Sequence, residues 1–282
     1  MICAWQAYLN ILPQWLRPEV DRQGREHLQE LRLRLGMPPE LVTASGTKWL
    51  ERTASSEDIS YVINAASRYS HWSASTTASG YITAPGGHRV GICGEAVVKD
   101  KSMTALRFAS ALCIRVARDF PGIGIGAAEK KGSVLLIGPP GSGKTTLMRD
   151  LIRCRSEEEH VAVVDERFEI FPMAQSAYCF PTGRKTDILS GCPKAQGVDA
   201  VLRCMTPDVI AMDEITEAGD CSALMEAGWC GVQLLATAHA GNLQDFYSRP
   251  IYRPLLDSGL FTYAVVLRKD KSWRMERMKS CT

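Results

Sequence analysis

The chain has 282 residues, of which 45% are hydrophobic and 23% are charged, and its formal net charge is +2. This composition is that of a folded protein with one large domain or two ordinary ones, and it excludes a disordered chain. A charge so close to neutral does not indicate a surface built to bind nucleic acid or a charged membrane. No run approaches the roughly 18 apolar residues of a membrane-spanning helix, so none is predicted.

The N-terminus and the cysteines bear on the cellular compartment. Residues 1–5 lack a basic segment followed by an apolar one, so no secretory signal is predicted. Ten cysteines are scattered without a Cys-x-x-Cys pair, and their spacing is not that of a zinc site. Reduced thiols in a cytosolic protein explain this pattern better than a disulfide framework does.

The first third of the chain has the pattern of a separate α+β module. Leucine alternates with arginine in the run 31–35, which predicts a half-buried strand or an edge strand. Serines open the segment 55–69, acidic residues follow them, and apolar residues then recur at helical spacing, so a capped amphipathic helix is predicted. Two strand-like runs in the segment 81–93 flank a Pro-Gly-Gly turn, which predicts a hairpin.

A glycine-rich stretch divides this module from the rest of the chain. We expect an N-terminal α+β domain over residues 1–118, a linker over 119–130 and a P-loop domain over 131–282. In the last of these, short apolar runs alternate with helical patterns, and each run ends in polar residues. The predicted strands are 134–137, 161–164, 209–212 and 232–236. Such alternation indicates a parallel sheet with its site at the carboxyl ends of the strands.

A phosphate-binding loop follows the first of these strands. Residues 138–145 fit the pattern G-x-x-x-x-G-K-[ST] in full, with a predicted helix over 144–154 behind them. The main-chain N–H groups of such a loop and the N-terminus of the helix favour phosphate oxygens. Lys144 is expected to reach the β- and γ-phosphates, and the Thr145 hydroxyl to ligate Mg²⁺. The expected nucleotide-binding residues are Gly138, Pro139, Pro140, Gly141, Ser142, Gly143, Lys144, Thr145 and Thr146.

Acidic residues end the strand at 209–212. Asp213 is expected to hold Mg²⁺ through water, as a second metal-binding residue beside Thr145. Glu214 is expected to polarise the attacking water. The alternative is that these two acids belong to a solvated loop.

Two other predicted strands end in residues of the same kind. Asp165 and Glu166 follow the strand at 161–164, and His239 follows the strand at 232–236. A carboxylate at such a position can orient water, and a histidine can sense the γ-phosphate. A lone histidine is more often a hydrogen-bonding residue of the structure, so both interpretations of His239 stay open.

Seven segments together give the sequence its family resemblance. They are 30–34, 88–95, 163–167, 186–189, 191–195, 209–215 and 234–239. On these segments the chain resembles the secretion-type ATPases, which drive type II and type IV secretion and pilus machines. It is most similar to one family among them, the stage III sporulation protein AA ATPases of endospore-forming bacteria. The phosphate loop is generic, whereas the Gly-Cys-Pro-Lys-Ala segment at 191–195 is specific to that family.

The resemblance implies a RecA-like P-loop domain with a parallel-rich sheet, preceded by a smaller α+β domain, and it implies ATP and Mg²⁺ as cofactors. It also implies catalytic roles for residues of three motifs. Asp165 and Glu166 match an aspartate box, Asp213 and Glu214 match the second Walker motif, and His239 matches a histidine box. Arg203 matches an arginine near a subunit interface. One departure concerns Lys185, where the family has arginine, although Arg184 could substitute.

Such ATPases work as hexameric rings, in which arginines of the N-terminal domain can complete a neighbour's nucleotide site. The candidates here are Arg89, Arg107, Arg115 and Arg118. Basic side chains on a solvated face are the alternative interpretation of each.

We therefore expect a MgATP-hydrolysing motor that energises a sporulation-associated export or channel apparatus. Its partners would be further copies of itself and a membrane protein, and it would be cytoplasmic and held at the membrane through that partner. One alternative is a RecA-like nucleic-acid motor, which the near-neutral charge and the lack of a basic stripe with aromatics disfavour. The other is a nucleotide-gated assembly scaffold with slow hydrolysis, which would keep the same motifs.

Overall fold

The computed structural model describes residues 1–67, 80–99, 102–174 and 176–278. The chain divides into two compact units. Unit 1 comprises Met1–Asp119 and Pro172–Phe180, and unit 2 comprises Phe120–Phe171 and Pro181–Thr282. The short segment 172–180, which the expected bounds assign to the P-loop domain, thus clusters with unit 1. As bounds of parts that fold independently, 1–118, 119–130 and 131–282 remain a proposal.

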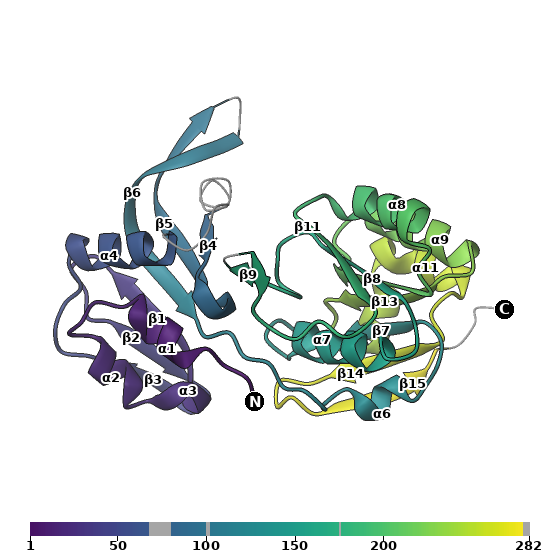
Figure 1. The fold of residues 1–282 in the computed structure, drawn as a ribbon, viewed down its shortest axis with the longest axis horizontal. Helices are drawn as coiled ribbons and strands as arrows, with labels where there is room; N and C mark the ends of the chain where they lie inside the picture. The colour runs from purple at the N-terminus through teal and green to yellow at the C-terminus, as the bar shows by residue number, and fades with distance from the viewer. Residues whose placement is uncertain (68–79, 100–101, 175, 279–282) are drawn as a thin grey trace. The chain divides into compact units, whose positions relative to one another are not determined.

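Unit 1 is built on an antiparallel sheet (Figure 1). Its helices are α1 (Trp5–Asn10), α2 (Arg17–Asp21), α3 (Gly24–His27) and α4 (Ser56–Ser67), with a 3-10 turn η1 (Pro85–Gly87). Its main strands are β1 (Leu28–Arg34), β2 (Glu40–Thr43), β3 (Gly46–Trp49), β4 (Tyr81–Thr83), β5 (Arg89–Lys99) and β6 (Ser102–Arg115). The order across the sheet is β3-β2-β1-β6-β5-β4. A two-stranded pair, β9 (Met173–Ala174) and β10 (Ala177–Tyr178), belongs to the same unit.

The sequence patterns of the first third correspond to these elements. The leucine alternation is β1, which lies inside the sheet between β2 and β6, so that Leu31 and Leu33 are fully buried. The predicted helix is α4, and Ser55 and Asp58 exchange hydrogen bonds between side chain and main chain at its start. The last part of that prediction, residues 68 and 69, lies outside the described residues. The predicted hairpin is β4 and β5 around η1.

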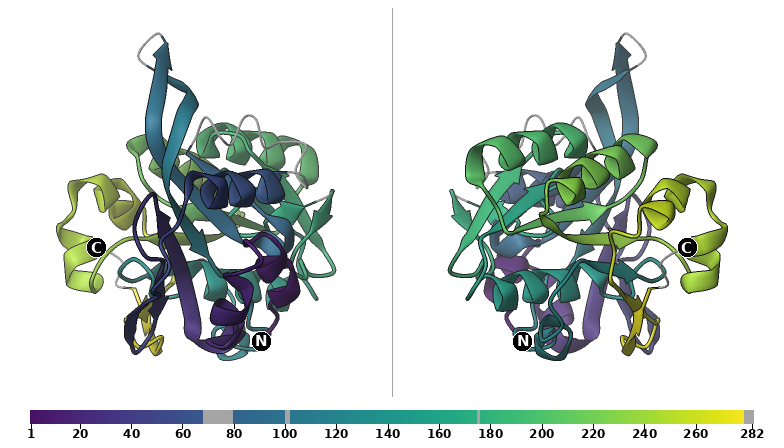
Figure 2. Two further views of the ribbon diagram at one scale, coloured as in Figure 1. Left: turned by 90° about the vertical axis from the view of Figure 1, so that its left-hand side faces the viewer. Right: turned by 90° about the vertical axis from the view of Figure 1, so that its right-hand side faces the viewer.

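Strands β5 and β6 extend past the ends of the neighbouring strands and continue there as a two-stranded ribbon (Figure 2). Pairing of β1 with β6 covers only residues 111–115 of β6, and pairing of β4 with β5 covers only residues 89–91 of β5. Farther along the ribbon, Val98 and Phe108 are exposed.

A buried histidine ties the N-terminal segment to the sheet of unit 1. His88 is fully buried, its Nδ1 accepts the main-chain N–H of Ala117 at 3.0 Å, and its Nε2 lies 3.0 Å from the carbonyl oxygen of Ala4. Because Nδ1 accepts, Nε2 carries the proton and donates to Ala4. Burial lowers the pKa of His88 to about 4, and the charge of Arg118 acts in the same direction.

Unit 2 is built on a sheet that is parallel except at one edge. Its strands are β7 (Val134–Ile137), β8 (Val161–Asp165), β11 (Thr186–Ser190), β12 (Val209–Glu214), β13 (Gln233–Ala238), β14 (Tyr263–Leu267) and β15 (Trp273–Arg277). Its helices are α6 (Ile125–Ala128), α7 (Lys144–Arg155), α8 (Lys194–Met205), α9 (Ala218–Trp229), α10 (Leu243–Ser248) and α11 (Arg253–Ser258), with a 3-10 turn η2 (Pro250–Tyr252). The order is β11-β8-β12-β13-β7-β14-β15, and only β14 and β15 pair antiparallel.

Both faces of this sheet are covered by helices (Figure 1). Along β7, Val134 and Leu136 belong to one core cluster with α7, whereas Leu135 and Ile137 belong to another with α8, α9 and α11. Burial on both faces explains why each predicted strand is a continuous apolar run. The four predicted strands occur as β7, β8, β12 and β13, so the predicted α/β class is confirmed.

Two further observations concern the cysteines and the length of the helices. The nine cysteines in the described ranges are unpaired. Within the described residues, every helix is too short or too polar to cross a membrane.

Candidate functional site

The phosphate loop connects β7 to α7. Gly143 is the residue before α7 and has φ 97° and ψ 17°, a left-handed conformation that side chains other than glycine rarely adopt. It lets the loop turn directly into a helix of 12 residues, whose first N–H groups have no partner within the helix. Ser142 Oγ is buried and, within the described residues, has no hydrogen-bond partner. A left-handed turn, free N–H groups and an unpartnered hydroxyl fit a phosphate ligand.

Lys144 begins α7 and is folded back on the loop. Its Nζ lies 2.8 Å from the carbonyl oxygen of Gly138, 3.2 Å from that of Pro139 and 2.8 Å from Nδ1 of His239. Burial lowers the pKa of Lys144, while the nearby carboxylates of Glu214 and Asp213 act in the opposite direction. The three contacts with Gly138, Pro139 and His239 occupy all three N–H bonds of the ammonium group. Thr145 and Thr146 follow in the first turn and are partly buried.

His239 connects Lys144 to Glu214. An ammonium group can only donate, so His239 Nδ1 accepts from Lys144, and Nε2 carries the ring proton. The carbonyl oxygen of Gly138 lies farther from Nδ1, at 3.4 Å, so the shorter contact sets the tautomer. Nε2 lies 2.8 Å from Glu214 Oε2 and donates to it. The structure thus brings three predicted residues, from the start of α7 and the ends of β12 and β13, into one connected group.

Asp213 lies beside this group, at an irregularity in the pairing of β12 with β13. The pKa of Asp213 is raised to about 7, mainly by burial, and the nearby carboxylates of Glu169, Asp165 and Glu214 act in the same direction. Such a position is unfavourable for a negative charge until a cation lies nearby. Among the described residues no cluster of three or more acidic, histidine or cysteine side chains could hold a metal by itself. A carboxylate, a threonine hydroxyl and nucleotide phosphates are the ligand set that Mg²⁺ commonly takes.

The two acids that follow β8 have different surroundings. Asp165 is fully buried, and its carboxylate accepts the main-chain N–H groups of Glu169, Ile170 and Phe171 at 2.8, 3.1 and 2.9 Å. Burial raises its pKa. The three hydrogen bonds to the Asp165 carboxylate hold residues 169–171, in the loop after β8, close to the end of that strand. Glu166 is partly exposed and faces the acidic residues at the end of β12.

Those acidic residues line a small cavity of about 20 Å³. Its walls are Glu166, Arg167, Glu169, Lys194, Asp213, Glu214 and Thr216. A volume of this size holds about one water molecule where polar partners are present. The cavity includes two cations that the motifs did not single out, Arg167 and Lys194.

The predicted arginines lie elsewhere. Arg203 is on α8 with its side chain 74% exposed, and it pairs with Asp199 at 2.8 Å. In unit 1, Arg107 pairs with Glu95 on the β5–β6 ribbon, and its side chain is 69% exposed. The structure therefore does not bring Arg203 into the group formed by the strand ends.

The other three candidates in unit 1 have local contacts. The Arg89 guanidinium lies 4.0 Å from the centre of the Tyr81 ring, and Arg115 Nε lies 3.3 Å from Glu30 Oε1. Arg118 donates to the carbonyl oxygens of Arg25 and Leu28.

Two lysines at the site were missed by sequence reasoning. Lys271, in the turn between β14 and β15, donates to the carbonyl oxygen of Gly141 in the phosphate loop. Lys194, in the family-specific segment, is buried beside Glu214. The available signal for Lys194 was its place directly after a proline, a residue that is common at the start of helices.

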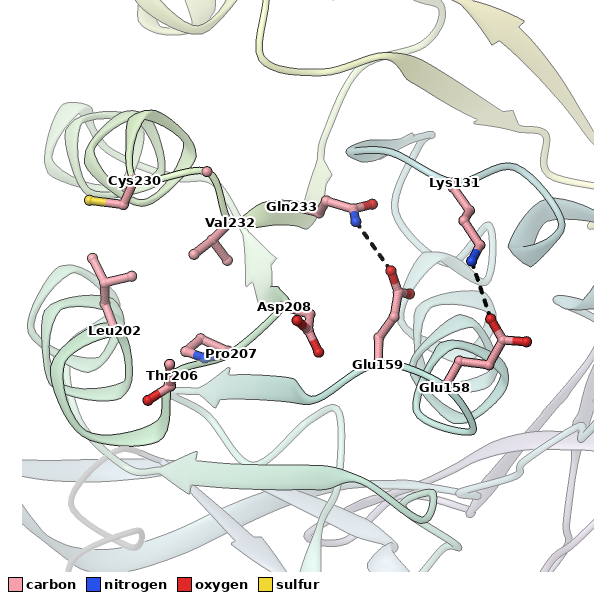
Figure 3. A pocket seen from close by; sticks show the side chains of 11 residues that line it. Lys131, Glu158, Glu159, Leu202, Thr206, Pro207, Asp208, Cys230, Val232 and Gln233 are labelled. Carbon is pink, nitrogen blue, oxygen red and sulfur yellow. Dashed lines mark hydrogen bonds and ion pairs between the residues drawn. The ribbon is translucent and has the colours of Figure 1, made fainter.

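A larger pocket, of about 590 Å³, lies at the amino ends of the unit 2 strands, opposite the ends that carry the phosphate loop (Figure 3). Asp208 and Val232, which line it, directly precede β12 and β13, whereas the phosphate-loop group follows the other ends of the strands. Two of its lining residues, Lys131 and Glu158, form an ion pair at 3.2 Å. The pocket contains none of the predicted site residues.

Comparisons of the sequence cover most of the chain. The profile of the family described as sporulation stage III, protein AA matches residues 6–276. Stage III sporulation protein AA of Bacillus subtilis (strain 168) is 31% identical over 277 residues, which cover 93% of this chain and 90% of that protein. The uncharacterized protein ycf45 of Porphyra purpurea is 30% identical over 284 residues, which cover 96% of this chain but only 46% of that protein.

Comparisons of the structure concern the fold. The ATPase DotB of Legionella pneumophila aligns with a TM-score of 0.55 at 16% identity, over 94% of this chain and 80% of that one. The pilus retraction motor PilT with bound ADP aligns with a TM-score of 0.57 at 14% identity, over 93% and 83%. These matches confirm the predicted architecture, a RecA-like P-loop domain preceded by a smaller N-terminal domain.

Proposed function

The chain belongs to the family of sporulation stage III protein AA, and from this premise we propose that it binds MgATP at the carboxyl edge of the unit 2 sheet and hydrolyses it. The observation that carries the proposal is the contact chain from Lys144 through His239 to Glu214. It joins a loop fitted to phosphate with a carboxylate suited to act as a base toward water.

The binding residues follow from the loop geometry. The phosphates would lie against the main-chain N–H groups of residues 138–143 and the N-terminus of α7. Lys144 would pair with the β- and γ-phosphates, and Ser142 Oγ would gain a partner. Thr145 and, through water, Asp213 would hold Mg²⁺, which neutralises phosphate charge when bound.

The same contacts suggest how the ligand-free site is held. Lys144 is engaged by Gly138, Pro139 and His239, so phosphate oxygens must displace these acceptors. Once Lys144 turns to phosphate, His239 keeps its hydrogen bond to Glu214 and can move together with that side chain. Glu214 would then orient the attacking water and accept its proton.

Other predicted residues receive different roles. We assign Asp165 to holding the loop 169–171, because its oxygens are occupied by main-chain N–H groups. Glu166, which faces the small cavity, would help to orient water. Arg203, which is exposed on α8, would act on a neighbouring copy.

The assembly and setting of this activity are part of the proposal. Copies of the chain would form a hexameric ring, in which Arg203 or an arginine of unit 1 completes a neighbour's site. The ring would energise a sporulation-associated export apparatus through a membrane protein, from the cytoplasmic side. The similarity to stage III sporulation protein AA supports this setting.

Phosphate release by the purified chain tests the proposal. The wild-type chain should release phosphate from MgATP, and Lys144→Ala should abolish both tight MgATP binding and release while the fold is kept. Lys131→Ala, which removes an exposed lysine at the opposite edge of the sheet, is the matched control and should behave as wild type. Equal release by the wild-type and Lys144→Ala chains would contradict the proposed site.

A further inference from the structure

Lys194 is a buried cation that contacts the residues directly after β12. Its Nζ lies 2.7 Å from the carbonyl oxygen of Glu214, 2.7 Å from Thr216 Oγ1 and 2.8 Å from Asp220 Oδ2. An ammonium group has three N–H bonds, and these three acceptors use all of them. Glu166 Oε2 lies 3.9 Å away, within ion-pair distance. Lys194 thus joins the ends of β8 and β12, which carry the proposed water-orienting carboxylates.

The family-specific segment puts Lys194 in this position. Pro193 precedes α8, and Lys194 is the first residue of the helix. One turn later, a side chain at Gly197 would come within 2.5 Å of Val164 Cγ1, so the glycine allows α8 to pack closely on β8. The start of α8 therefore lies at the carboxyl ends of the strands, where the first side chain reaches the end of β12.

Asp220 is the charge partner of Lys194, and the pair is almost completely buried, with side chains 6% and 0% exposed. Asp220 Oδ2 also accepts the main-chain N–H groups of Thr216 and Glu217. A pair of this kind balances a large desolvation cost, so its net effect on stability is small, although the loss of one partner is strongly destabilising. Stability alone therefore does not explain the choice of a lysine here.

The hydrogen bond from Lys194 Nζ to the carbonyl oxygen of Glu214 is a separate feature, because the ion pair with Asp220 does not require it. β12 pairs irregularly with β13 between Met212 and Glu214, so the sheet does not hold this stretch in regular register. Lys194 holds the Glu214 main chain from one side, while His239 holds its side chain from the other. Lys194 also lines the cavity of about 20 Å³, which has room for about one water molecule.

We propose that Lys194 is a positioning residue for ATP hydrolysis, which fixes Glu214 and Glu166 around the attacking water. The proposal rests on the hydrolysis proposed above. It requires that Lys194 affect turnover separately from folding and from nucleotide binding. An error of about 1 Å in the placement of a catalytic group costs up to about 10²-fold in rate.

A double substitution separates the two roles of the lysine. Lys194→Met leaves Asp220 buried without its partner, so the melting temperature should fall, by roughly 5 °C or more. Lys194→Met with Asp220→Asn removes both charges, and the asparagine oxygen can still accept from Thr216 and Glu217. This double variant should recover most of the melting temperature that Lys194→Met loses, because no unpaired charge then stays buried.

The quantities to measure on the full chain are the melting temperature, the MgATP affinity and kcat, and the control Lys131→Met should match the wild type in all three. The double variant should bind MgATP within about threefold of the wild type and turn it over about 10- to 100-fold more slowly. Recovery of kcat together with the melting temperature would overturn the proposal, because Lys194 would then only balance Asp220. A loss confined to affinity would overturn it as well.

A milder variant decides the matter if the double variant does not fold. Thr216→Val, at an exposed position, removes a hydroxyl that accepts from Lys194 and also lies 3.2 Å from Asp220 Oδ2. It should lower kcat at least about twofold with unchanged affinity, and a wild-type kcat would contradict the proposal. The hydrolysis proposal fails separately, and takes this one with it, if the wild-type chain shows no turnover beyond that of Lys144→Ala.

Discussion

His239 Nε2 lies 2.8 Å from Glu214 Oε2, and each of the two side chains is 32% exposed. Lys144 occupies the other ring nitrogen of the same histidine. The imidazole therefore links the cation of the phosphate loop to the carboxylate at the end of β12, and a change at His239 acts on both.

Replacing His239 with alanine should lower kcat about 10- to 100-fold, because Glu214 loses the donor that orients it. MgATP affinity should stay the same or rise, since Lys144 no longer has to leave the imidazole. Steady-state turnover and titration with a fluorescent ATP analogue give the two quantities. His160→Ala, which removes an exposed histidine paired with Asp208, should change neither. A wild-type kcat in His239→Ala would remove the histidine from the reaction.

Asp165→Asn should destabilise unit 2, because the buried carboxylate accepts three main-chain N–H groups and an amide would place its own NH₂ against at least one of them. We expect a loss of about 2 to 3 kcal/mol in the free energy of unfolding, typical of hydrogen bonds to a charged group. Chemical denaturation measures it. Asp187→Asn, on the exposed face of β11, is the control and should have almost no effect. An equally stable Asp165→Asn chain would argue against the loop-holding role.

Unit 1 should lose stability in acid because of His88. Its folded pKa of about 4 lies below the ordinary value of 6.5, so between these values the unfolded chain binds more protons than the folded one. This contribution is fully present above pH 6.5 and is lost as the pH falls toward 4. At about 1.4 kcal/mol per pKa unit, it amounts to about 2 kcal/mol between pH 7.5 and pH 5.

Denaturant unfolding followed by tryptophan fluorescence, at pH 7.5 and pH 5, measures this change. His88→Gln should remove about 2 kcal/mol of the pH dependence, whereas His27→Gln, at an exposed position, should keep it. The same pH dependence in both variants would mean that another group titrates.

Turnover should depend on assembly if an arginine acts between copies. Arg203→Ala should lower kcat, by about 10³- to 10⁵-fold for a transition-state arginine, and specific activity of the wild type should fall on dilution. Mixing Arg203→Ala with Lys144→Ala should restore some activity, because one kind of mixed interface has both intact halves. Arg253→Ala is the matched control, because Arg253 forms an exposed ion pair with Asp257 one helical turn away, as Arg203 does with Asp199. Constant specific activity at monomeric dilution, with no rescue, would contradict a shared site.

Much of the fold could be predicted from the sequence because its signals are local. The apolar runs of β7, β8, β12 and β13 are buried on both faces, so they read as continuous strands. The glycine pattern of the phosphate loop reports a backbone requirement, here the left-handed Gly143. Parallel strands end at one edge of a sheet, which is why residues far apart in sequence could be expected at one place.

The parts that could not be predicted depend on tertiary packing. An aspartate at a strand end has the same appearance in sequence whether it faces a ligand or, like Asp165, binds its own loop. Lys194 gives no local sign that its side chain will be buried against Asp220, because that contact depends on how α8 packs on β8. The segment 172–180 gives no sign either that it clusters with unit 1.

The central claim, that Glu214 is the base of an ATPase site, is tested most directly by single-turnover hydrolysis with Glu214→Gln. The amide keeps the shape of the side chain but cannot accept the proton from water. The variant should bind MgATP as tightly as the wild type and hydrolyse it about 10²- to 10⁴-fold more slowly. Hydrolysis at a near-normal rate in Glu214→Gln would contradict the account and move the base to another residue.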